Sequence, residues 1–173
     1  DEFLISDAGV LKRLDASLVG GGGITEADQW RLTANKTDSS DITANLERND
    51  STGFGYIGTG MTESSGIFSF PSTGIYLVET TGSFEAIPDD SVNLIINVTT
   101  DNGSYTEVAK GLTAGDGSST GFGSSTTSFY FDVTNVSTHK VKFSTSSISS
   151  GTSLMGNSTM NFTYFNFIRL GDT

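Results

Sequence analysis

Short runs of apolar residues alternate with clusters of Gly, Ser, Thr, Asn and Asp along most of the chain. No window keeps the 3.6-residue apolar period of a helix, although the segment from Ile24 to Trp30 could hold one short helical turn. Nine runs have the length and the β-branched or aromatic content of strands: Gln29 to Thr33, Phe54 to Thr59, Ile67 to Phe70, Ile75 to Thr80, Val92 to Thr99, Tyr105 to Lys110, Phe129 to Val133, Lys140 to Ser144, and Asn161 to Leu170. The pattern predicts an all-β chain folded as an antiparallel β-sandwich or jelly roll.

Most of these strands alternate between apolar and polar residues, and the segment from Val92 to Val98 is the clearest case. Its apolar set is Val92, Leu94, Ile96 and Val98, and its polar set includes Asn93 and Asn97. Successive side chains of a strand point to opposite faces of the sheet. We therefore expect one buried and one solvated face for this strand.

Two strands carry apolar residues on both faces, namely Ile75 to Val78 and Phe162 to Ile168. An antiparallel strand of this kind must be covered by the facing sheet and again from outside the sandwich. An identical neighbouring chain is the simplest cover, because closed symmetry is the rule for oligomers and aromatic residues are favoured in their interfaces.

The first nineteen residues, Asp1 to Val19, have the pattern of a small separate β-hairpin module. A lone hairpin of this size is marginal in water, so we expect it to be ordered by neighbouring chains. Gly20 to Gly23 then form a glycine run, which predicts a hinge between this attachment module and a head domain at residues 24–173. The alternative is a glycine turn inside one domain.

The charge of the chain excludes several classes of partner. Twenty Asp and Glu residues against nine Lys and Arg give a net charge of −11, and the cations are scattered along the chain. Nucleic acids and anionic membrane surfaces are bound through clustered cations, so neither is expected as a partner. The chain has no Cys, which rules out disulfides and thiolate metal sites. It has no apolar run approaching the length of a membrane span, so no membrane insertion is expected.

The residues that could support catalysis or metal binding are few. His139 is the only His and is expected at a solvent-facing turn, and no Gly-x-Ser-x-Gly motif occurs. The carboxylate pairs Asp89-Asp90 and Asp38 with Asp41 have the surroundings of solvated turns. Two turns that begin at Asp101 and Asp116 offer oxygen ligands for calcium, but neither has EF-hand spacing. We therefore expect no enzyme activity and no cofactor.

The segment from Gly111 to Thr127 is polar and rich in glycine, which predicts a flexible loop suited to recognition. Phe122 lies in it between two glycines and is expected either to meet a ligand or to fold back into the core. We take Phe122, with Asp116 and Tyr105, as the candidate receptor-binding residues.

Two segments resemble the C1q-like and tumour-necrosis-factor-like trimeric jelly rolls. Phe68-Ser69-Phe70-Pro71-Ser72-Thr73-Gly74-Ile75-Tyr76 resembles their Phe-x-x-Pro-x-x-Gly-x-Tyr signature, and Ser158 to Leu170 is similar to their closing strand, which lines the trimer axis. The family's Gly-Asp-x-Val-Trp stretch is absent, and His139 to Lys142 stand in its place. The resemblance covers roughly Trp30 to Leu170 and implies a homotrimer. The interface residues that it implies are Tyr76, Val78, Tyr164, Phe165 and Phe167.

A second resemblance concerns the front of the chain. Asp1 to Leu14 is similar to the short hairpins that precede terminal domains in bacteriophage tail fibres, especially those of marine phages. Together the two resemblances imply a trimeric fibre-tip domain on the outside of a virion. It would bind a host-surface glycan or protein, and residues 1–19 would attach it to other virion proteins. The alternative is a purely structural capsid decoration, head-fibre or tail adaptor protein.

Overall fold

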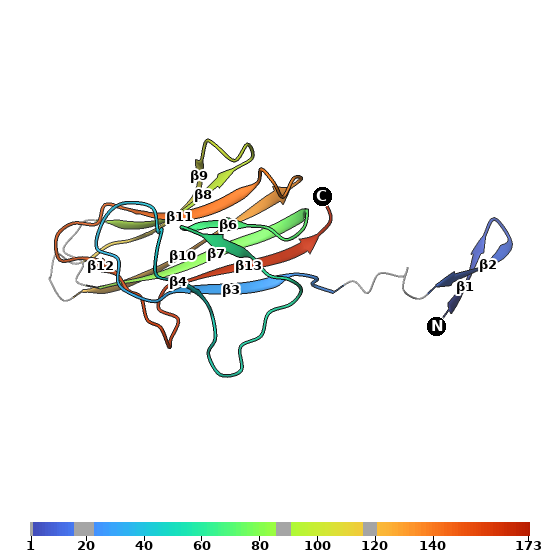
Figure 1. The fold of residues 1–173 in the computed structure, drawn as a ribbon, viewed down its shortest axis with the longest axis horizontal. Coiled ribbons are helices and arrows are strands. Elements are labelled where there is room, and N and C mark those ends of the chain that lie inside the picture. The colour runs from blue at the N-terminus through green and yellow to red at the C-terminus, as the bar shows by residue number, and fades with distance from the viewer. Residues whose placement is uncertain (1, 16–22, 86–90, 116–120) are drawn as a thin grey trace.

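The computed structural model describes residues 2–15, 23–85, 91–115 and 121–173. The regular secondary structure in these ranges consists of β-strands, as predicted (Figure 1). In chain order the strands are β1 (Glu2–Asp7), β2 (Val10–Asp15), β3 (Ala27–Leu32), β4 (Leu46–Arg48), β5 (Thr62–Ser64), β6 (Ile67–Ser69), β7 (Gly74–Glu85), β8 (Val92–Thr99), β9 (Thr106–Thr113), β10 (Phe122–Val133), β11 (Lys140–Ser146), β12 (Ser153–Leu154) and β13 (Tyr164–Gly171).

Residues 23–173 contribute two antiparallel sheets that pack face to face as a sandwich (Figure 1). The six-stranded sheet has the order β10-β7-β13-β3-β4, with β12 also paired to β7, and the five-stranded sheet has the order β5-β6-β11-β8-β9. Strand β13 is the last in the chain, yet it lies in the middle of its sheet between β7 and β3. The two ends of the head sequence are therefore joined by β-pairing.

Aromatic side chains from both sheets fill the space between them. Phe143 of β11 contacts Phe165 of β13 with ring centroids 4.3 Å apart, and Phe68 of β6 lies 5.0 Å from Phe167. All four rings are buried. Every second residue of β7 also points into this layer, as strand geometry requires.

Several predicted strands are confirmed, and β8 has the predicted bounds Val92–Thr99. Two local expectations are wrong. The proposed helical turn at Ile24 to Trp30 is occupied mainly by β3. The proposed strand at Phe54 to Thr59 is a loop with one bridge, from Ile57 to Ala27. Gly53 directly precedes this segment and Gly58 lies within it. Their φ values of +87° and +77° are not strand conformations.

The expected wet face of β8 is also wrong, because all eight of its residues are buried. The strand lies between β11 and β9 in the five-stranded sheet, and neighbouring side chains cover its polar residues. Asn93 donates to the Ser146 hydroxyl at 3.0 Å and Asn97 donates to the Ser144 hydroxyl at 2.8 Å. The NH₂ groups of both amides are therefore satisfied, whereas the side-chain carbonyl oxygen of Asn93 is buried without a hydrogen-bond partner.

Strands β1 and β2 form the predicted N-terminal hairpin, which turns at Ala8 and Gly9 with positive φ at both residues. Leu4 and Leu11 of this hairpin are exposed. Residues 16–22, which include Gly20, Gly21 and Gly22 of the proposed hinge, lie outside the described residues. The division into an attachment module and a head stays a prediction.

Candidate functional site

The side chains expected at a subunit interface divide between the two faces of the six-stranded sheet. Tyr76, Val78, Phe165 and Phe167 point into the sandwich and are at most 1% exposed. They hold the two sheets of one chain together and cannot contact a second chain directly, which corrects their assignment as interface residues. Only Tyr164 points away from the core, where it is half-buried.

The side of the six-stranded sheet that faces away from the five-stranded sheet is here called the outer face. An apolar row crosses it near the end where the chain enters the head at Ala27. In the strand register, Tyr130 of β10 lies opposite Leu77 of β7, and Leu77 lies opposite Ile168 of β13. Tyr130 is 66% exposed, and the other two are half-buried. This row is an uncovered apolar strip on a sheet, as the two-faced strands predict.

A polar row runs beside the apolar row, two residues further along the strands. Asn166 donates to Glu79 at 2.9 Å, and Gln29 donates to Asn166 at 2.7 Å. The side-chain amides of Asn49 and Asn161 in turn donate to the side-chain oxygen Oε1 of Gln29 at 2.7 and 2.6 Å. Because the side chains are already hydrogen-bonded to one another, covering this row would leave few of its groups unsatisfied.

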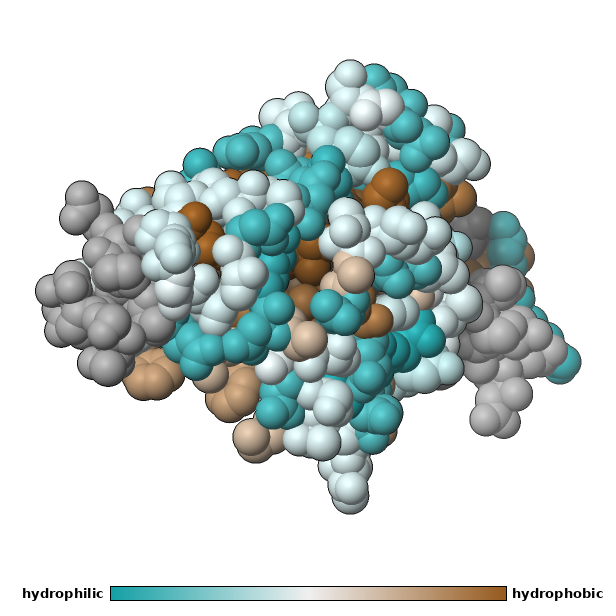
Figure 2. All heavy atoms as spheres, turned by 60° about the vertical axis from the view of Figure 1, so that its left-hand side comes forward, coloured by the Kyte–Doolittle hydropathy of each residue, from teal (hydrophilic) through white to brown (hydrophobic). Residues whose placement is uncertain are grey.

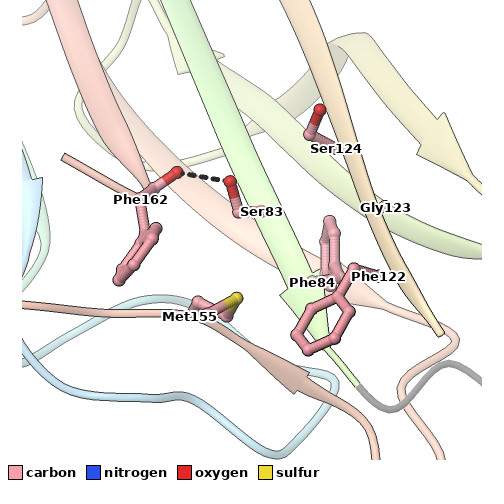
Figure 3. Close-up of a pocket in the computed structure, with 7 residues that line it drawn as sticks. All are labelled: Ser83, Phe84, Phe122, Gly123, Ser124, Met155 and Phe162. Carbon is pink, nitrogen blue, oxygen red and sulfur yellow. Dashed lines mark hydrogen bonds between the residues drawn. The ribbon is translucent and has the colours of Figure 1, made fainter. Parts of the chain in front are cut away.

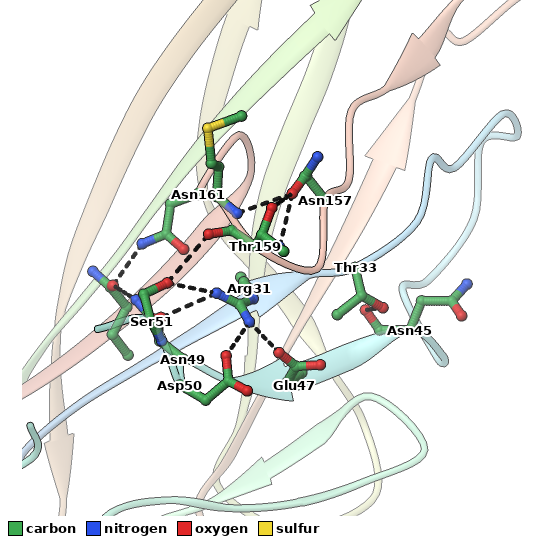
Figure 4. Close-up of polar contacts among 12 residues, drawn as sticks. Arg31, Thr33, Asn45, Glu47, Asn49, Asp50, Ser51, Asn157, Thr159 and Asn161 are labelled. Atoms are coloured by element: carbon green, nitrogen blue, oxygen red, sulfur yellow. Dashed lines mark hydrogen bonds and ion pairs between the residues drawn. The ribbon is translucent and has the colours of Figure 1, made fainter. Parts of the chain in front are cut away.

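Arg31 lies on the outer face at the edge near β4 and is fully buried, which is unusual for a cation (Figure 4). Its guanidinium pairs with Glu47 and Asp50 and donates to Asn49 at 3.1 Å and Ser51 at 2.9 Å. Burial lowers the pKa of Arg31, but the hydrogen bonds and charges of the two carboxylates outweigh it and the pKa lies above its ordinary value. This network ties the segment 47–51 to β3, and the sequence pattern gave no indication of it.

A pocket of about 540 Å³ opens at the far end of the outer face, away from Ala27, and is here called the distal pocket (Figure 3). Its apolar lining comes from three separate parts of the chain: β7, the start of β10, and the segment after β12. The lining residues are Ser83, Phe84, Phe122, Gly123, Ser124, Met155 and Phe162. Ser83 donates to the backbone carbonyl of Phe162 at 2.9 Å, which fixes the segment that carries Phe162 against β7.

Phe122 is the one predicted receptor-binding residue that lines this pocket. Its ring is 73% exposed, so it does not fold back into the core. The expected flexible loop is shorter than predicted, because β9 extends to Thr113 and β10 begins at Phe122. Asp116 lies outside the described residues.

Tyr105 lies elsewhere, on the side of the five-stranded sheet that faces away from the core. The ammonium of Lys142 lies 4.4 Å from the centre of its ring. Its hydroxyl is buried without a hydrogen-bond partner, and burial together with the charge of Asp41 raises the pKa of Tyr105. The structure therefore does not bring Tyr105 and Phe122 into one site.

His139 is buried, which corrects its expected position at a solvent-facing turn. Its ring stacks on Phe131 with centroids 5.5 Å apart and lies within 3.2 Å of the Thr134 hydroxyl. Asp38 pairs with Lys36 and Asp41 with Lys142, whereas Asp89 and Asp90 lie outside the described residues. Within the described ranges no group of three His, Asp or Glu side chains could hold a metal ion.

The turn at Asp101 is organised by its own carboxylate, whose Oδ1 accepts from the Thr99 hydroxyl at 2.7 Å and from the amides of Gly103 and Ser104 at 2.8 and 2.9 Å. Oδ1 of Asp101 is thus engaged as the acceptor of an Asx turn, which accounts for this Asp as a turn residue.

These bonds, led by that from Thr99, lower the pKa of Asp101. A carboxyl whose pKa is lower in the folded state stabilises the fold above its unfolded pKa, and the contribution disappears as the pH falls through the folded pKa. We expect a carboxyl ¹³C titration to place the Asp101 midpoint below that of an unfolded peptide, and Thr99→Val to raise it. An unchanged midpoint in Thr99→Val would contradict this account.

The described residues contain no helix that is long and apolar enough to cross a membrane.

Comparison with solved structures identifies the fold as a tumour-necrosis-factor-like jelly roll. The chain superposes on Eiger TNF from S. frugiperda with a TM-score of 0.65 and 13% identity, over 85% of this chain and 93% of that chain. It superposes on murine APRIL with a TM-score of 0.61 and 12% identity, over 84% of this chain and 98% of that chain. No family model and no curated protein matches the sequence. At this identity the likeness extends to the fold.

Proposed function

We propose that the chain is a homotrimeric, non-enzymatic binding domain at the outer end of a virion appendage such as a bacteriophage fibre. The observation that carries the proposal is the outer face of the six-stranded sheet. It presents the apolar row Tyr130, Leu77 and Ile168 beside a polar row that is already hydrogen-bonded.

A second copy of the chain is the simplest cover for this face. Apolar rows on a flat sheet are characteristic of subunit interfaces, where aromatic side chains are enriched and charged ones depleted. Glu79 is the charged residue of the polar row, and Asn166 already donates to it. The resemblance of Phe68 to Tyr76 and of the closing strand to trimeric jelly rolls supplies the number three.

The attachment to a virion is supported by the N-terminal hairpin. Leu4 and Leu11 are exposed on β1 and β2, so the hairpin by itself leaves apolar surface in water. A small hairpin of this kind needs neighbouring chains to be ordered. This requirement, and the similarity of Asp1 to Leu14 to hairpins of tail fibres, favour a role in attaching the head to other virion proteins.

The two ends of the six-stranded sheet would then have different tasks. The chain enters the head beside Ala27, and Arg169 donates to the Thr25 hydroxyl at 3.2 Å, so the first and last strands meet at this end (Figure 1). The distal pocket lies at the opposite end, where Phe122 pairs with Glu85. In a fibre, the first end would face the shaft and the second end would face the host.

The oligomeric state tests the proposal most directly. We expect light scattering at micromolar concentration to give three times the chain mass, and the double variant Leu77→Asp with Ile168→Asp to weaken association by about 100-fold or more. Leu112→Asp is the matched control, because Leu112 is exposed on β9 of the other sheet. A monomeric parent protein, or a double variant that assembles normally, would refute the proposed trimer.

The virion location needs its own experiment. Gold-labelled antibodies against the head should decorate the tips of fibres in electron micrographs of intact particles. Labelling spread over the capsid would favour the decoration alternative, and unlabelled particles would contradict a virion role.

A further inference from the structure

We infer that the distal pocket, with the adjoining side chain of Glu85, binds a neutral pyranose sugar of a surface glycan. This inference rests on the proposed function, since it names the ligand class of a binding domain, but it makes a separate claim about one site. The argument depends on an exposed aromatic ring, a pre-oriented carboxylate and the local charge.

The aromatic part of the site is built from Phe122 and Phe162, which project from β10 and from the segment before β13 (Figure 3). Met155 lies between them, and Phe84 also borders the pocket, although its side chain is buried on the core side of β7. Phe122 is 73% exposed, so its ring is accessible to a ligand. A pyranose ring has one face formed by C–H groups, and this face packs well on an aromatic surface of this kind.

Glu85 supplies a polar group next to that ring. In the pairing of β7 with β10 it lies directly opposite Phe122, so the two side chains share one face of the sheet. Its Oε1 accepts from Asn35 at 2.6 Å and from Ser153 at 2.8 Å. Asn35 is itself held by the backbone amide of Gly156 at 2.9 Å.

This arrangement leaves the carboxylate ready to bind hydroxyl groups. The two hydrogen bonds fix the orientation of Glu85 before any ligand arrives, and its Oε2 has no hydrogen-bond partner among the described residues. An ionised carboxylate accepts strong hydrogen bonds from hydroxyl donors. The hydroxyl of Ser124, which also lines the pocket, adds a second group that can donate or accept.

The local charge selects against acidic sugars. None of the described residues that line the pocket is a cation, Glu85 is an anion, and the whole chain carries a net charge of −11. A sialic acid or a phosphorylated sugar would be repelled, whereas a neutral hexose or N-acetylhexosamine would not. Figure 2 turns this end of the molecule toward the viewer, and among its coloured residues hydrophobic and hydrophilic ones lie side by side. Such a mixed surface suits a ligand with both C–H faces and hydroxyls.

The pocket also lies where a host glycan could reach it. It is at the end of the sheet opposite the apolar row and the point of chain entry, and three weak sites on one assembly would act together by avidity. The competing occupant is a side chain of a second copy. In that case, removing the Phe122 ring would weaken assembly instead of sugar binding.

Saturation-transfer NMR on the full chain tests the inference. The probes are methyl α-D-glucopyranoside, methyl α-D-mannopyranoside, methyl β-D-galactopyranoside and N-acetylglucosamine, with N-acetylneuraminic acid as the acidic comparison. We expect transfer to at least one neutral probe and weaker transfer to the acidic one. Phe122→Ala and Glu85→Gln should each lower the affinity by about tenfold. Phe122→Trp should retain binding, and Leu112→Ala is the matched control for loss of an exposed apolar side chain.

Light scattering on the same samples separates this inference from the proposed function. A trimer that binds none of the neutral probes overturns the sugar site and leaves the trimer standing. Sugar binding by a monomer supports the site and refutes the trimer. If Phe122→Ala dissociates the assembly, or binds the sugar as tightly as the parent, the pocket belongs to a subunit interface or to no site, and the inference fails.

Discussion

Replacing Phe165 and Phe167 together by alanine is expected to unfold the head. Both rings are buried between the sheets. The ring centroids of Phe165 and Phe143 are 4.3 Å apart, and those of Phe167 and Phe68 are 5.0 Å apart. Each truncation of a buried Phe costs about 3–5 kcal/mol, and a domain has only about 5–15 kcal/mol of stability. Urea unfolding followed by circular dichroism measures the loss.

The control for this variant is Tyr164→Ala, because Tyr164 belongs to the same strand but points to the outer face. It should leave the unfolding midpoint much closer to that of the parent and should affect assembly instead. If the Phe165 and Phe167 variant keeps the parent midpoint and only loses its partners, the two rings lie at an interface and the core assignment is incorrect.

The second large effect concerns the buried charge of Arg31. In Glu47→Gln with Asp50→Asn, the guanidinium would stay buried without a carboxylate. Breaking a fully buried ion pair costs about 3–5 kcal/mol, and the loss of stability here should be smaller because both carboxylates are partly exposed to water. Arg31→Met should cost less than half as much, since it removes the charge and fills a similar volume. The two carboxylates can then return to water, because their side chains are 37% and 76% exposed.

Chemical unfolding of the double carboxamide variant and of Arg31→Met in parallel shows which of the two loses more free energy of unfolding. The Nε of Arg31 is buried without a hydrogen-bond partner, which adds to the cost of keeping the guanidinium there. An Arg31→Met variant that is less stable than the double carboxamide variant would show that the pairs themselves stabilise the head. The reverse order would show that the carboxylates mainly compensate a burial penalty.

The fold class was predictable because its long strands have clear period-two patterns. Strands β4, β5 and β12 were missed, since each is only two or three residues long, too short to show a periodic pattern. The alternation in Ile75 to Val78 separates two sets of side chains correctly. It does not say which set points toward the five-stranded sheet. The interface positions of Tyr76 and Val78 came from the family resemblance, and both side chains are buried in the core.

The candidate site was only partly predictable, for a related reason. Phe122 could be singled out because an aromatic ring between glycines is unusual. Its companions Glu85, Phe162 and Met155 come from separate segments, and no local pattern links them. The same holds for Arg31, whose partners Glu47 and Asp50 lie at least sixteen residues away in sequence. Contacts of this kind depend on strand order, which periodicity does not determine.

The central position of β13 also constrains how the head can form during synthesis. A ribosome makes β3 and β7 long before Tyr164–Gly171, yet β13 is the strand that joins them. Until the last residues emerge, both strands keep an unpaired edge, and such edges are sites of misassociation. Pairing of β13 with β3 must also close a loop of more than a hundred residues, which slows folding. A chain that stops before Tyr164 would therefore expose two sheet edges at once, and the head can become a native subunit only after its translation is essentially complete.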